Sequence, residues 1–197
     1  MYAKFLKRVL DFVIALVMIV VLFVPMVVIA LAVFVSDPGP VFYRQKRFAK
    51  SGPDGKYRYF KIIKFRTMKI NTPDVPTDKL KNPEQYVTAF GKFLRKTSLD
   101  ELPQLFNILV GQMSFVGPRP ALWNQTKLMR LRDLNGSSAL RPGLTGWAQI
   151  NGRDDIPEKS KAEYDGEYVS RISFGFDFKC FFATFFKAFV KREGVVG

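Results

Sequence analysis

The chain has 197 residues, a formal net charge of +14, no histidine and a single cysteine, Cys180. This length allows one domain with a modest core and is too short for two, while one cysteine excludes an intramolecular disulfide framework and fits a reducing compartment. The charge predicts a polyanionic partner, which could be nucleic acid, an anionic lipid surface or a phosphorylated substrate. Nucleic acid fits least, because the cations are spread among hydrophobic segments without zinc-finger or basic-zipper spacing.

An uncharged apolar segment runs from Phe12 to Val35, and it exceeds the roughly 20 residues needed to cross a bilayer. It is also longer than the ~7–15 residues of a secretory signal core, which is the competing interpretation. Pro25 removes a helical hydrogen bond near the middle, so we expect a kink or break there. Because positive charge near membrane segments prefers the cytoplasm, the flanks predict a re-entrant helix rather than a plain spanning one. These flanking cations are Lys4, Lys7 and Arg8 before the segment and Arg44, Lys46, Arg47 and Lys50 after it.

The residues that follow predict an exit turn and a β-hairpin. The turn is Asp37-Pro38-Gly39-Pro40, where a helix cannot easily continue. Residues 41–48 and 57–68 are rich in aromatic and β-branched side chains and are separated by turn residues 52–55. We expect most cations of this hairpin to lie on a solvated face. Residues 72–81, which contain two prolines, predict a loop without chemistry.

Helices are expected on both sides of the central part of the chain. Asn82-Pro83-Glu84 combines an N-cap residue, a proline at the first position and an early acid, so we expect a helix to begin there and to lead to Arg95. An irregular stretch is expected over residues 111–120. A helix rich in Leu, Met and Arg should follow and end near Asn135, with its arginines in solvent.

Between them, Ser98 and Glu101 form a capping-box pattern before the apolar series of residues 102–109. This pattern predicts a helix with Asp100 and Glu101 in its first turn. The alternative is that the two acids have no catalytic role and only stabilise a helix N-terminus, an effect worth about 0.3–1 kcal/mol each.

Asp100 and Glu101 are nevertheless the best catalytic candidates. Without histidine, a nucleophile or base must come from another side chain, and adjacent carboxylates are the natural substitute. Arg95 and Lys96 precede the pair and Arg119 lies between two prolines, so three cations could converge on one helix end that suits a phosphate. A carboxylate there would be ionised at neutral pH and could attack phosphorus, while its neighbour holds a divalent metal.

The last part of the chain offers a loop and an aromatic helix. Residues 141–147 are rich in glycine, so their backbone could approach a ligand closely, and Trp147 could stack on a base or sugar. Residues 174–190 carry eight phenylalanines, interrupted by Lys179 and Lys187. These lysines argue against a second spanning helix and predict a helix that lies in the membrane interface, with an ordinary core helix as the alternative.

Four long motifs occur in a fixed order, which is far more specific than any single short pattern. They are Lys64-Phe65-Arg66-Thr67-Met68, residues 93–105, Ser114-Phe115-Val116-Gly117-Pro118-Arg119-Pro120 and residues 142–149. Together they closely resemble the bacterial sugar transferases called monotopic phosphoglycosyl transferases, and the resemblance covers nearly the whole chain. Larger members of that family carry additional N-terminal helices or domains, so this chain is expected to correspond to the catalytic core.

The resemblance implies an α+β monotopic membrane protein. Its expected parts are a re-entrant membrane helix (1–36), a cytoplasmic and mostly helical catalytic domain with a β-hairpin (37–173), and a C-terminal interfacial helix (174–197). The implied place is the cytoplasmic face of the bacterial inner membrane. A homodimer is an open alternative to a monomer.

The implied reaction moves a sugar-1-phosphate from a UDP-sugar to polyprenyl (undecaprenyl) phosphate through a covalent aspartyl intermediate, and it requires magnesium. Partners are then these two substrates and membrane lipids, with no nucleic acid. By resemblance the catalytic residues are Asp100 and Glu101, and the metal ligands are Glu101 and Asp165; an exposed helix acid is the alternative for Asp165. The residues expected to contact substrate are Lys64, Arg66, Arg95, Arg119, Arg141, Trp147 and Arg153.

Two rivals from other classes remain. A non-catalytic basic membrane-binding protein would bind lipid without turning over UDP-sugars. A membrane-anchored nucleic-acid-binding protein would show a steep salt dependence and no need for magnesium. Neither explains the joint occurrence of the acid pair, the Pro-Arg-Pro stretch and the glycine-rich loop around Trp147.

Overall fold

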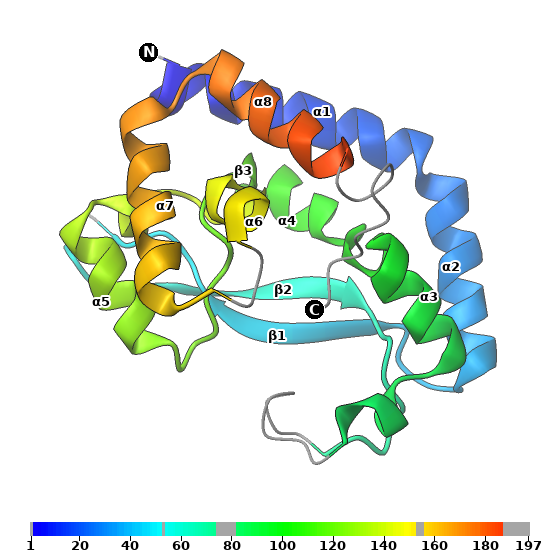
Figure 1. The fold of residues 1–197 in the computed structure, drawn as a ribbon. Helices are drawn as coiled ribbons and strands as arrows, with labels where there is room; N and C mark the ends of the chain where they lie inside the picture. Colours follow the sequence, from blue (N-terminus) through cyan, green and yellow to red (C-terminus); the bar gives the residue numbers. More distant parts are fainter. Residues whose placement is uncertain (1, 53, 74–81, 153–155, 187–197) are drawn as a thin grey trace.

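A computed structural model describes residues 2–52, 54–73, 82–152 and 156–186 (Figure 1). It confirms a mixed helical and β architecture with an antiparallel hairpin. The strands are β1 (Phe42–Phe48), β2 (Tyr59–Phe65), β3 (Ser114–Val116) and β4 (Gly143–Thr145). The α-helices are α1 (Lys7–Val21), α2 (Phe23–Ser36), α3 (Ala89–Thr97), α4 (Gln104–Leu109), α5 (Thr126–Leu134), α6 (Trp147–Gly152), α7 (Glu158–Arg171) and α8 (Phe174–Phe185). Shorter helical turns are η1 (Tyr2–Leu6), η3 (Pro83–Tyr86), η4 (Leu99–Glu101) and η5 (Ser137–Ala139).

The N-terminal apolar segment is a bent pair of helices. Among the described residues no single helix is long and apolar enough to span a membrane, whereas α1 and α2 together are, with a bend of 64° between them. The break falls at Leu22, one turn before Pro25. A proline ring clashes with the carbonyl group four residues earlier, here that of Val21, and cannot bond to it. The kink expected near Pro25 is therefore confirmed.

The bent pair borders the rest of the molecule and keeps much of its apolar surface uncovered. In Figure 1, α1 and α8 lie at the same end of the molecule, and α2 descends past α3. The buried side chains of the bent pair are few: the apolar ones are Ala15, Met26, Ile29 and Val33, and the polar one is Asp11. Outward side chains such as Val20 and Val35 stay 69% and 78% exposed. Such a contiguous apolar surface is unusual for a protein surrounded by water.

The hairpin has the predicted position. Strands β1 and β2 pair antiparallel, with Phe42 opposite Phe65 and Phe48 opposite Tyr59. Because side chains alternate along a strand, Phe60 and Ile62 point to the same face, where both are buried. Helix α4 packs on this face and lies between the hairpin and α1 (Figure 1).

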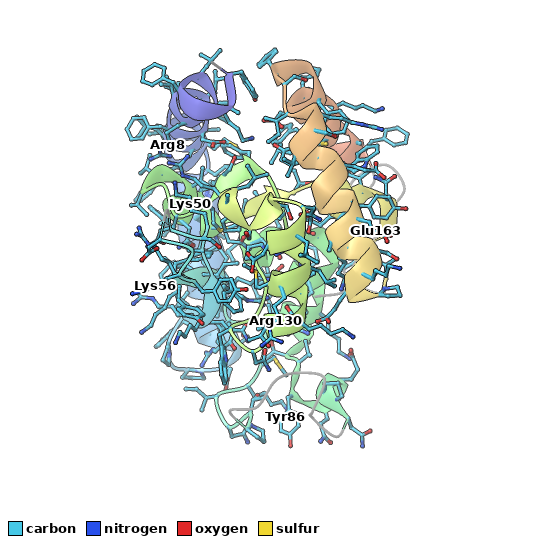
Figure 2. The ribbon with its side chains drawn as sticks, turned by 90° about the vertical axis from the view of Figure 1, so that its left-hand side faces the viewer. Arg8, Lys50, Lys56, Tyr86, Arg130 and Glu163 are labelled. Carbon is cyan, nitrogen blue, oxygen red and sulfur yellow. The ribbon has the colours of Figure 1, made fainter. Side chains whose placement is uncertain are left out.

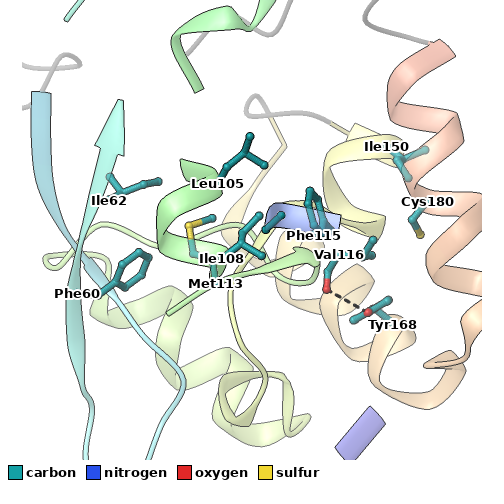
Figure 3. Close-up of a cluster of buried hydrophobic side chains, with 11 residues drawn as sticks. Phe60, Ile62, Leu105, Ile108, Met113, Phe115, Val116, Ile150, Tyr168 and Cys180 are labelled. Atoms are coloured by element: carbon teal, nitrogen blue, oxygen red, sulfur yellow. Dashed lines mark hydrogen bonds between the residues drawn. The ribbon is translucent and has the colours of Figure 1, made fainter. Parts of the chain in front are cut away.

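The main core gathers residues from most of the chain (Figure 3). Strand β2 supplies Phe60 and Ile62, and helix α4 supplies Leu105 and Ile108. In Figure 3 the hydroxyl group of Tyr168, from α7, lies 3.2 Å from the main-chain oxygen of Val116. The remaining labelled members are Met113, Phe115, Ile150 and Cys180. The single cysteine, Cys180, is thus a packing residue, because it is buried among apolar side chains.

A buried carboxylate joins the two ends of the described chain. Asp177 of α8 accepts hydrogen bonds of 2.6 Å from the hydroxyl groups of Tyr2 and Tyr168, and it forms an ion pair with Lys7. These contacts hold η1 and α1 against α7 and α8. A buried carboxylate is tolerated only when it is paired and hydrogen-bonded in this way.

A short parallel sheet was not predicted. Strands β3 and β4 pair in parallel, Ser114 with Gly143 and Val116 with Thr145, where we expected only irregular loops. The glycines explain the close approach, because a Cβ atom on Gly143 would lie 2.2 Å from the main-chain nitrogen of Gly117. The glycine-rich motif therefore serves contact between two segments of the chain itself.

The predicted start of a helix at Asn82 is wrong. Asn82 has a φ of +54° and makes no side-chain cap; a turn of 3-10 helix follows, and Val87 then forms a β-bridge with Met68. The α-helix begins only after Thr88, whose hydroxyl oxygen accepts a 2.9 Å bond from the nitrogen of Gly91. This segment, with Tyr86, lies at the opposite end of the molecule from Arg8 (Figure 2).

Helix α5 ends where it was expected to end, at the C-cap residue Asn135. The expectation that its arginines are solvated holds for Arg130 (Figure 2) but is wrong for Arg132, which is 4% exposed. Of the expected C-terminal helix, the part up to Phe186 lies within the described residues and is helical.

Candidate active site

The acid pair lies in a tight turn between two helices. Helix α3 ends at Thr97, Ser98 adopts a left-handed conformation with a φ of +57°, and η4 then carries Asp100 and Glu101. The predicted capping box is wrong, because Ser98 closes α3 through its main-chain nitrogen and makes no side-chain cap. Helix α4 begins only at Gln104. The carboxylate of Glu101 is therefore available for another partner.

That partner is Lys64 of strand β2. The ammonium nitrogen of Lys64 lies 2.7 Å from Oε1 of Glu101 and 3.8 Å from Oδ2 of Asp100. The three side chains are 16%, 15% and 10% exposed, respectively. Strand alternation places Lys64 on the face of Phe60 and Ile62, so the hairpin delivers this cation into the buried layer. One cation thus serves two adjacent carboxylates.

The surroundings shift the pKa values of Asp100 and Glu101 in opposite directions. Burial raises the pKa of Asp100 to about 6, and the charge of Glu101 adds to this, against the opposing effects of Lys64 and Arg95. Burial would also raise the pKa of Glu101, but Lys64, Arg119 and Arg47 together lower it below its usual value. Two neighbouring carboxylates with separated pKa values are typical of acids with different roles.

A cavity of about 390 Å³ opens beside Asp100. It is lined by the hairpin and by residues 66–70, 72 and 73, and Asp100 is the only acid among the described residues that line it. Its cations are Arg44, Arg47, Lys64, Arg66, Lys69 and Arg95. A cavity with such a charge balance attracts an anion, and guanidinium groups are well suited to phosphate oxygens.

Two of the predicted substrate contacts, Arg66 and Arg95, are held at this cavity by hydrogen bonds and an ion pair. Nε of Arg95 donates a 2.9 Å bond to the hydroxyl oxygen of Thr67. Arg66 bonds to the main-chain oxygen of Asp37, and its Nη1 lies 3.5 Å from the carboxylate of that residue. The structure therefore brings Lys64, Arg66 and Arg95 together with Asp100.

Arg119 approaches the pair from the Pro-Arg-Pro stretch. It is half-buried, and its charge contributes to the lowered pKa of Glu101. Arg47 is a site residue that the sequence reasoning missed: its Nη1 donates a 2.9 Å bond to the oxygen of Pro120, and its charge acts on Glu101 as well. No local signal separates Arg47 from the other cations of β1, because its place depends on a contact 73 residues away.

Three other predicted substrate contacts lie elsewhere or cannot be placed. Nε of Arg141 donates a 3.1 Å bond to the oxygen of Gly111, beyond the end of α4. The indole nitrogen of Trp147 donates a 2.9 Å bond to Glu167, and its ring lies against α8. Neither lines the cavity. Arg153 lies outside the described residues.

Asp165, the second expected metal ligand, is engaged in an ion pair. Its Oδ2 accepts bonds of 2.8 and 2.7 Å from Nε and Nη2 of Arg132, and it is 2% exposed, so the alternative of an exposed helix acid is wrong. This pair joins α5 to α7, and the geometry gives Asp165 no support as a metal ligand.

Asp100 and Glu101 still fit magnesium as a donor set. No group of three or more acidic, histidine or cysteine side chains within the described parts of the chain could enclose a metal. Magnesium, however, usually keeps several waters and takes one or two carboxylates together with substrate phosphates. Two hard oxygen donors next to a cationic cavity meet this requirement.

Comparison with known proteins places these residues in a family. The family model for bacterial sugar transferases matches residues 2–191. A UDP-glucose:undecaprenyl-phosphate glucose-1-phosphate transferase of Escherichia coli is 42% identical over 196 residues, which cover 96% of this chain and 41% of that protein. An undecaprenyl-phosphate galactose phosphotransferase of Salmonella typhimurium is 34% identical over 208 residues, covering 98% of this chain and 42% of that protein.

A shorter relative is matched over most of its own length. The exopolysaccharide production protein ExoY of Sinorhizobium fredii is 37% identical over 195 residues, which cover 90% of this chain and 83% of that protein. The chain thus spans less than half of the two longer relatives but most of this one. The extent of these matches, together with the acid pair and its cations, shows that the chain belongs to the bacterial sugar transferase family.

Proposed function

We propose that this chain is a phosphoglycosyl transferase that moves a sugar-1-phosphate from a UDP-sugar to polyprenyl phosphate and releases UMP. The observation that carries the proposal is the shared contact of Asp100 and Glu101 with Lys64 beside a cavity lined by six cations. Both substrates are anionic, so fixed cations that neutralise charge at phosphorus are the main requirement. The names of the relatives, which include UDP-glucose and undecaprenyl phosphate, support these substrates.

Asp100 is the proposed nucleophile. Its carboxylate oxygen forms a bond to the sugar-linked phosphorus, and the bond from that phosphorus to the UMP oxygen breaks. An oxygen of polyprenyl phosphate then attacks the same phosphorus and releases Asp100, which leaves a polyprenyl diphosphate sugar. A pKa of about 6 leaves Asp100 mostly ionised at pH 7, while its burial favours a reaction that disperses its charge.

Glu101 and Asp100 would hold magnesium, which supplies positive charge at the diphosphate when it is bound. We expect Glu101→Gln to weaken this site, because an amide oxygen carries no net charge. Binding of Mn²⁺ in the presence of UDP, followed by electron paramagnetic resonance, measures the site without turnover. Unchanged Mn²⁺ affinity in this variant would assign the metal to other ligands.

Lys64, Arg66, Arg95 and Arg119 are the proposed phosphate contacts. Arg141 and Trp147 are not included, because each is bonded away from the cavity. Arg119 is held between two prolines, and a lysine cannot reproduce its planar pair of donors. We therefore expect Arg119→Lys to lose at least about tenfold in kcat/KM, in line with loss of one charge-assisted hydrogen bond.

A mass measurement tests the central step. Incubation with a UDP-sugar alone in magnesium buffer should release UMP and add a phospho-sugar to the peptide that contains Asp100, and Asp100→Asn should abolish both. A panel of UDP-sugars then identifies the transferred sugar. If the variant keeps robust turnover, Asp100 is not the nucleophile; if the wild-type chain binds lipid but releases no UMP, the non-catalytic membrane-binding alternative holds.

We further propose that the enzyme rests on the cytoplasmic face of the bacterial inner membrane. Support comes from the exposed apolar surface of α1 and α2 and from one face of α8. The exposed phenylalanines of this face, between 51% and 57% exposed and four residues apart, are Phe174, Phe178, Phe182 and Phe186. Their spacing aligns them along the helix, as an interfacial helix requires.

A further inference from the structure

Within the described part of the chain, strand β2 has one edge without a strand partner, because its sheet contains only β1 and β2. The side-chain amide of Asn107, in α4, bonds to this edge. Its oxygen accepts a 3.0 Å bond from the main-chain nitrogen of Ile63, and its nitrogen donates a 2.9 Å bond to the main-chain oxygen of Lys61. One side chain thus supplies the donor and the acceptor that a neighbouring strand would supply.

The amide is itself held in place. Asn107 is 1% exposed, and its nitrogen also donates a 2.7 Å bond to the side-chain oxygen of Gln112. Its main-chain oxygen accepts bonds from the nitrogens of Gln112 and Met113, which close the turn after α4. The side chain therefore has little freedom, and its two bonds fix the distance between α4 and β2.

The two elements joined by Asn107 carry the two halves of the acid and cation site. Ile63, which bonds to Asn107, is followed directly by Lys64, and α4 follows the turn that holds Asp100 and Glu101. We propose that Asn107 is a positioning residue: it holds the ammonium group of Lys64 at the two carboxylates. This role rests on the phosphoryl transfer proposed above, although the placement of Lys64 can be measured without it.

The geometry explains why the position matters. Without the amide, the nitrogen of Ile63 and the oxygen of Lys61 lose their partners, and among the described contacts only apolar packing then holds β2 against α4. A displacement of about 1 Å at a catalytic group can cost on the order of 100-fold in rate. The effect should fall on kcat and on adduct formation, while KM for the UDP-sugar changes little, because the cavity cations Arg66 and Arg95 remain tethered.

Two variants and one matched control test this role. Asn107→Ala removes the whole amide, whereas Asn107→Asp keeps an acceptor for Ile63 and loses the donor to Lys61 and Gln112. Asn135→Ala is the control, because Asn135 bonds to the oxygen of Ala162 and lies in the contact of α5 with α7. All rates are measured well below the melting temperature of each variant, per folded molecule.

The expected results distinguish positioning from general stability. Asn107→Ala should slow formation of the phospho-sugar adduct about 10- to 100-fold. Asn107→Asp should slow it at least as much, because it places a buried carboxylate against the oxygens of Lys61 and Gln112. Asn135→Ala should lower the melting temperature without slowing the reaction. In a Lys64→Met background, Asn107→Ala should slow the reaction by less than about twofold, since residues that act as a unit are not additive. If the two effects instead multiply fully, Asn107 does not act through Lys64.

Two readouts do not depend on activity. Hydrogen exchange at the amide of Ile63 should accelerate at least about tenfold in Asn107→Ala, because a lost hydrogen bond permits local opening. Acylation of Lys64 by an amine reagent should increase relative to the exposed Lys56, because the ammonium group leaves its carboxylates. If wild type forms no adduct, the proposed function fails but these readouts still decide the placement. Unchanged Lys64 acylation in Asn107→Ala would overturn the proposal.

Discussion

The Arg8 guanidinium, near the start of α1, donates a 2.7 Å hydrogen bond to the main-chain oxygen of Leu109 at the end of α4. A second bond of 2.7 Å reaches the oxygen of Ile108. These carbonyl groups belong to the last turn of α4 and have no partners within that helix. A cation there also favours the negative end of the helix dipole. The apolar helix pair is thus connected directly to the helix that follows the acid pair.

We predict that Arg8→Gln lowers the free energy of unfolding by about 1–3 kcal/mol, as expected for loss of hydrogen bonds to a charged group. The measurement is thermal denaturation in lipid nanodiscs. Arg130→Gln serves as the control, because Arg130 is exposed (Figure 2) and surface changes usually stay within about 0.5 kcal/mol. Equal melting temperatures for the two variants would show that the cap is energetically unimportant.

Activity should depend on pH through Asp100. Only the ionised carboxylate attacks phosphorus, so the rate of adduct formation per folded molecule should fall as the pH decreases through about 6. Above pH 7 this group should impose no further change. Single-turnover rates between pH 5 and pH 8 give the profile. A rate that stays constant down to pH 5 would contradict the raised pKa of Asp100 in the free enzyme.

The same raised pKa predicts that ionised Asp100 lowers the stability of the folded protein at neutral pH. Between its usual value of 3.8 and about 6, the folded protein binds more protons at Asp100 than the unfolded chain does, so stability from this group falls as the pH rises. Asp100→Asn should therefore be more stable than wild type at pH 7.5, by on the order of 2 kcal/mol, and should lose most of that advantage near pH 4. Melting curves at both pH values provide the check; lower stability of the variant at pH 7.5 would refute it.

The buried pair of Arg132 and Asp165 leads to a fourth prediction. Removal of one partner leaves an uncompensated buried charge, so Arg132→Met should cost about 3–5 kcal/mol, and the double variant Arg132→Met/Asp165→Leu should recover much of that loss. Denaturation of the single and double variants measures the coupling. If Asp165 has only this structural role, the double variant keeps the magnesium dependence of adduct formation. A raised magnesium requirement would return Asp165 to the metal site.

The bend before Pro25 leads to a fifth prediction. Pro25→Leu restores a main-chain donor for the oxygen of Val21 and removes the ring clash, so α1 and α2 should form one straighter helix that favours a full span. Single cysteines at positions 4 and 50, in a Cys180→Ser background, report the topology through an impermeant thiol reagent on intact cells. We expect protection at both positions when Pro25 is present and labelling at position 4 in the Pro25→Leu variant. Labelling of that cysteine from outside in the presence of Pro25 would establish a true span.

Local patterns predicted the elements that local chemistry controls. The hairpin followed from two aromatic and β-branched runs around a turn, and the bend followed from Pro25. The acid pair was found because a chain without histidine has few other candidates. The predicted capping box was wrong, because Ser98 can end the preceding helix as readily as it can begin the following one. The local sequence does not distinguish these two roles.

Long-range contacts account for what the sequence did not reveal. The role of Arg47 depends on Pro120, that of Asn107 on the free edge of β2, and that of Arg132 on Asp165. In each case the partner lies more than 30 residues away. A propensity or a spacing rule acts within one turn or strand, so it cannot identify such pairs.

Tyr2 and Lys7 can contact Asp177 only after the residues between them have been synthesised, so this contact forms late in folding during synthesis. The partners are separated by 175 and 170 positions along the chain, and the intervening residues leave the ribosome at about 5–20 per second. Helix α1 must therefore wait many seconds for the carboxylate that pairs with Lys7. During this interval an apolar segment without its partner is exposed to aggregation, which favours delivery to the bilayer before α8 has been made. Maturation is then completed by a contact between α1 and a segment that is translated 170 residues after Lys7.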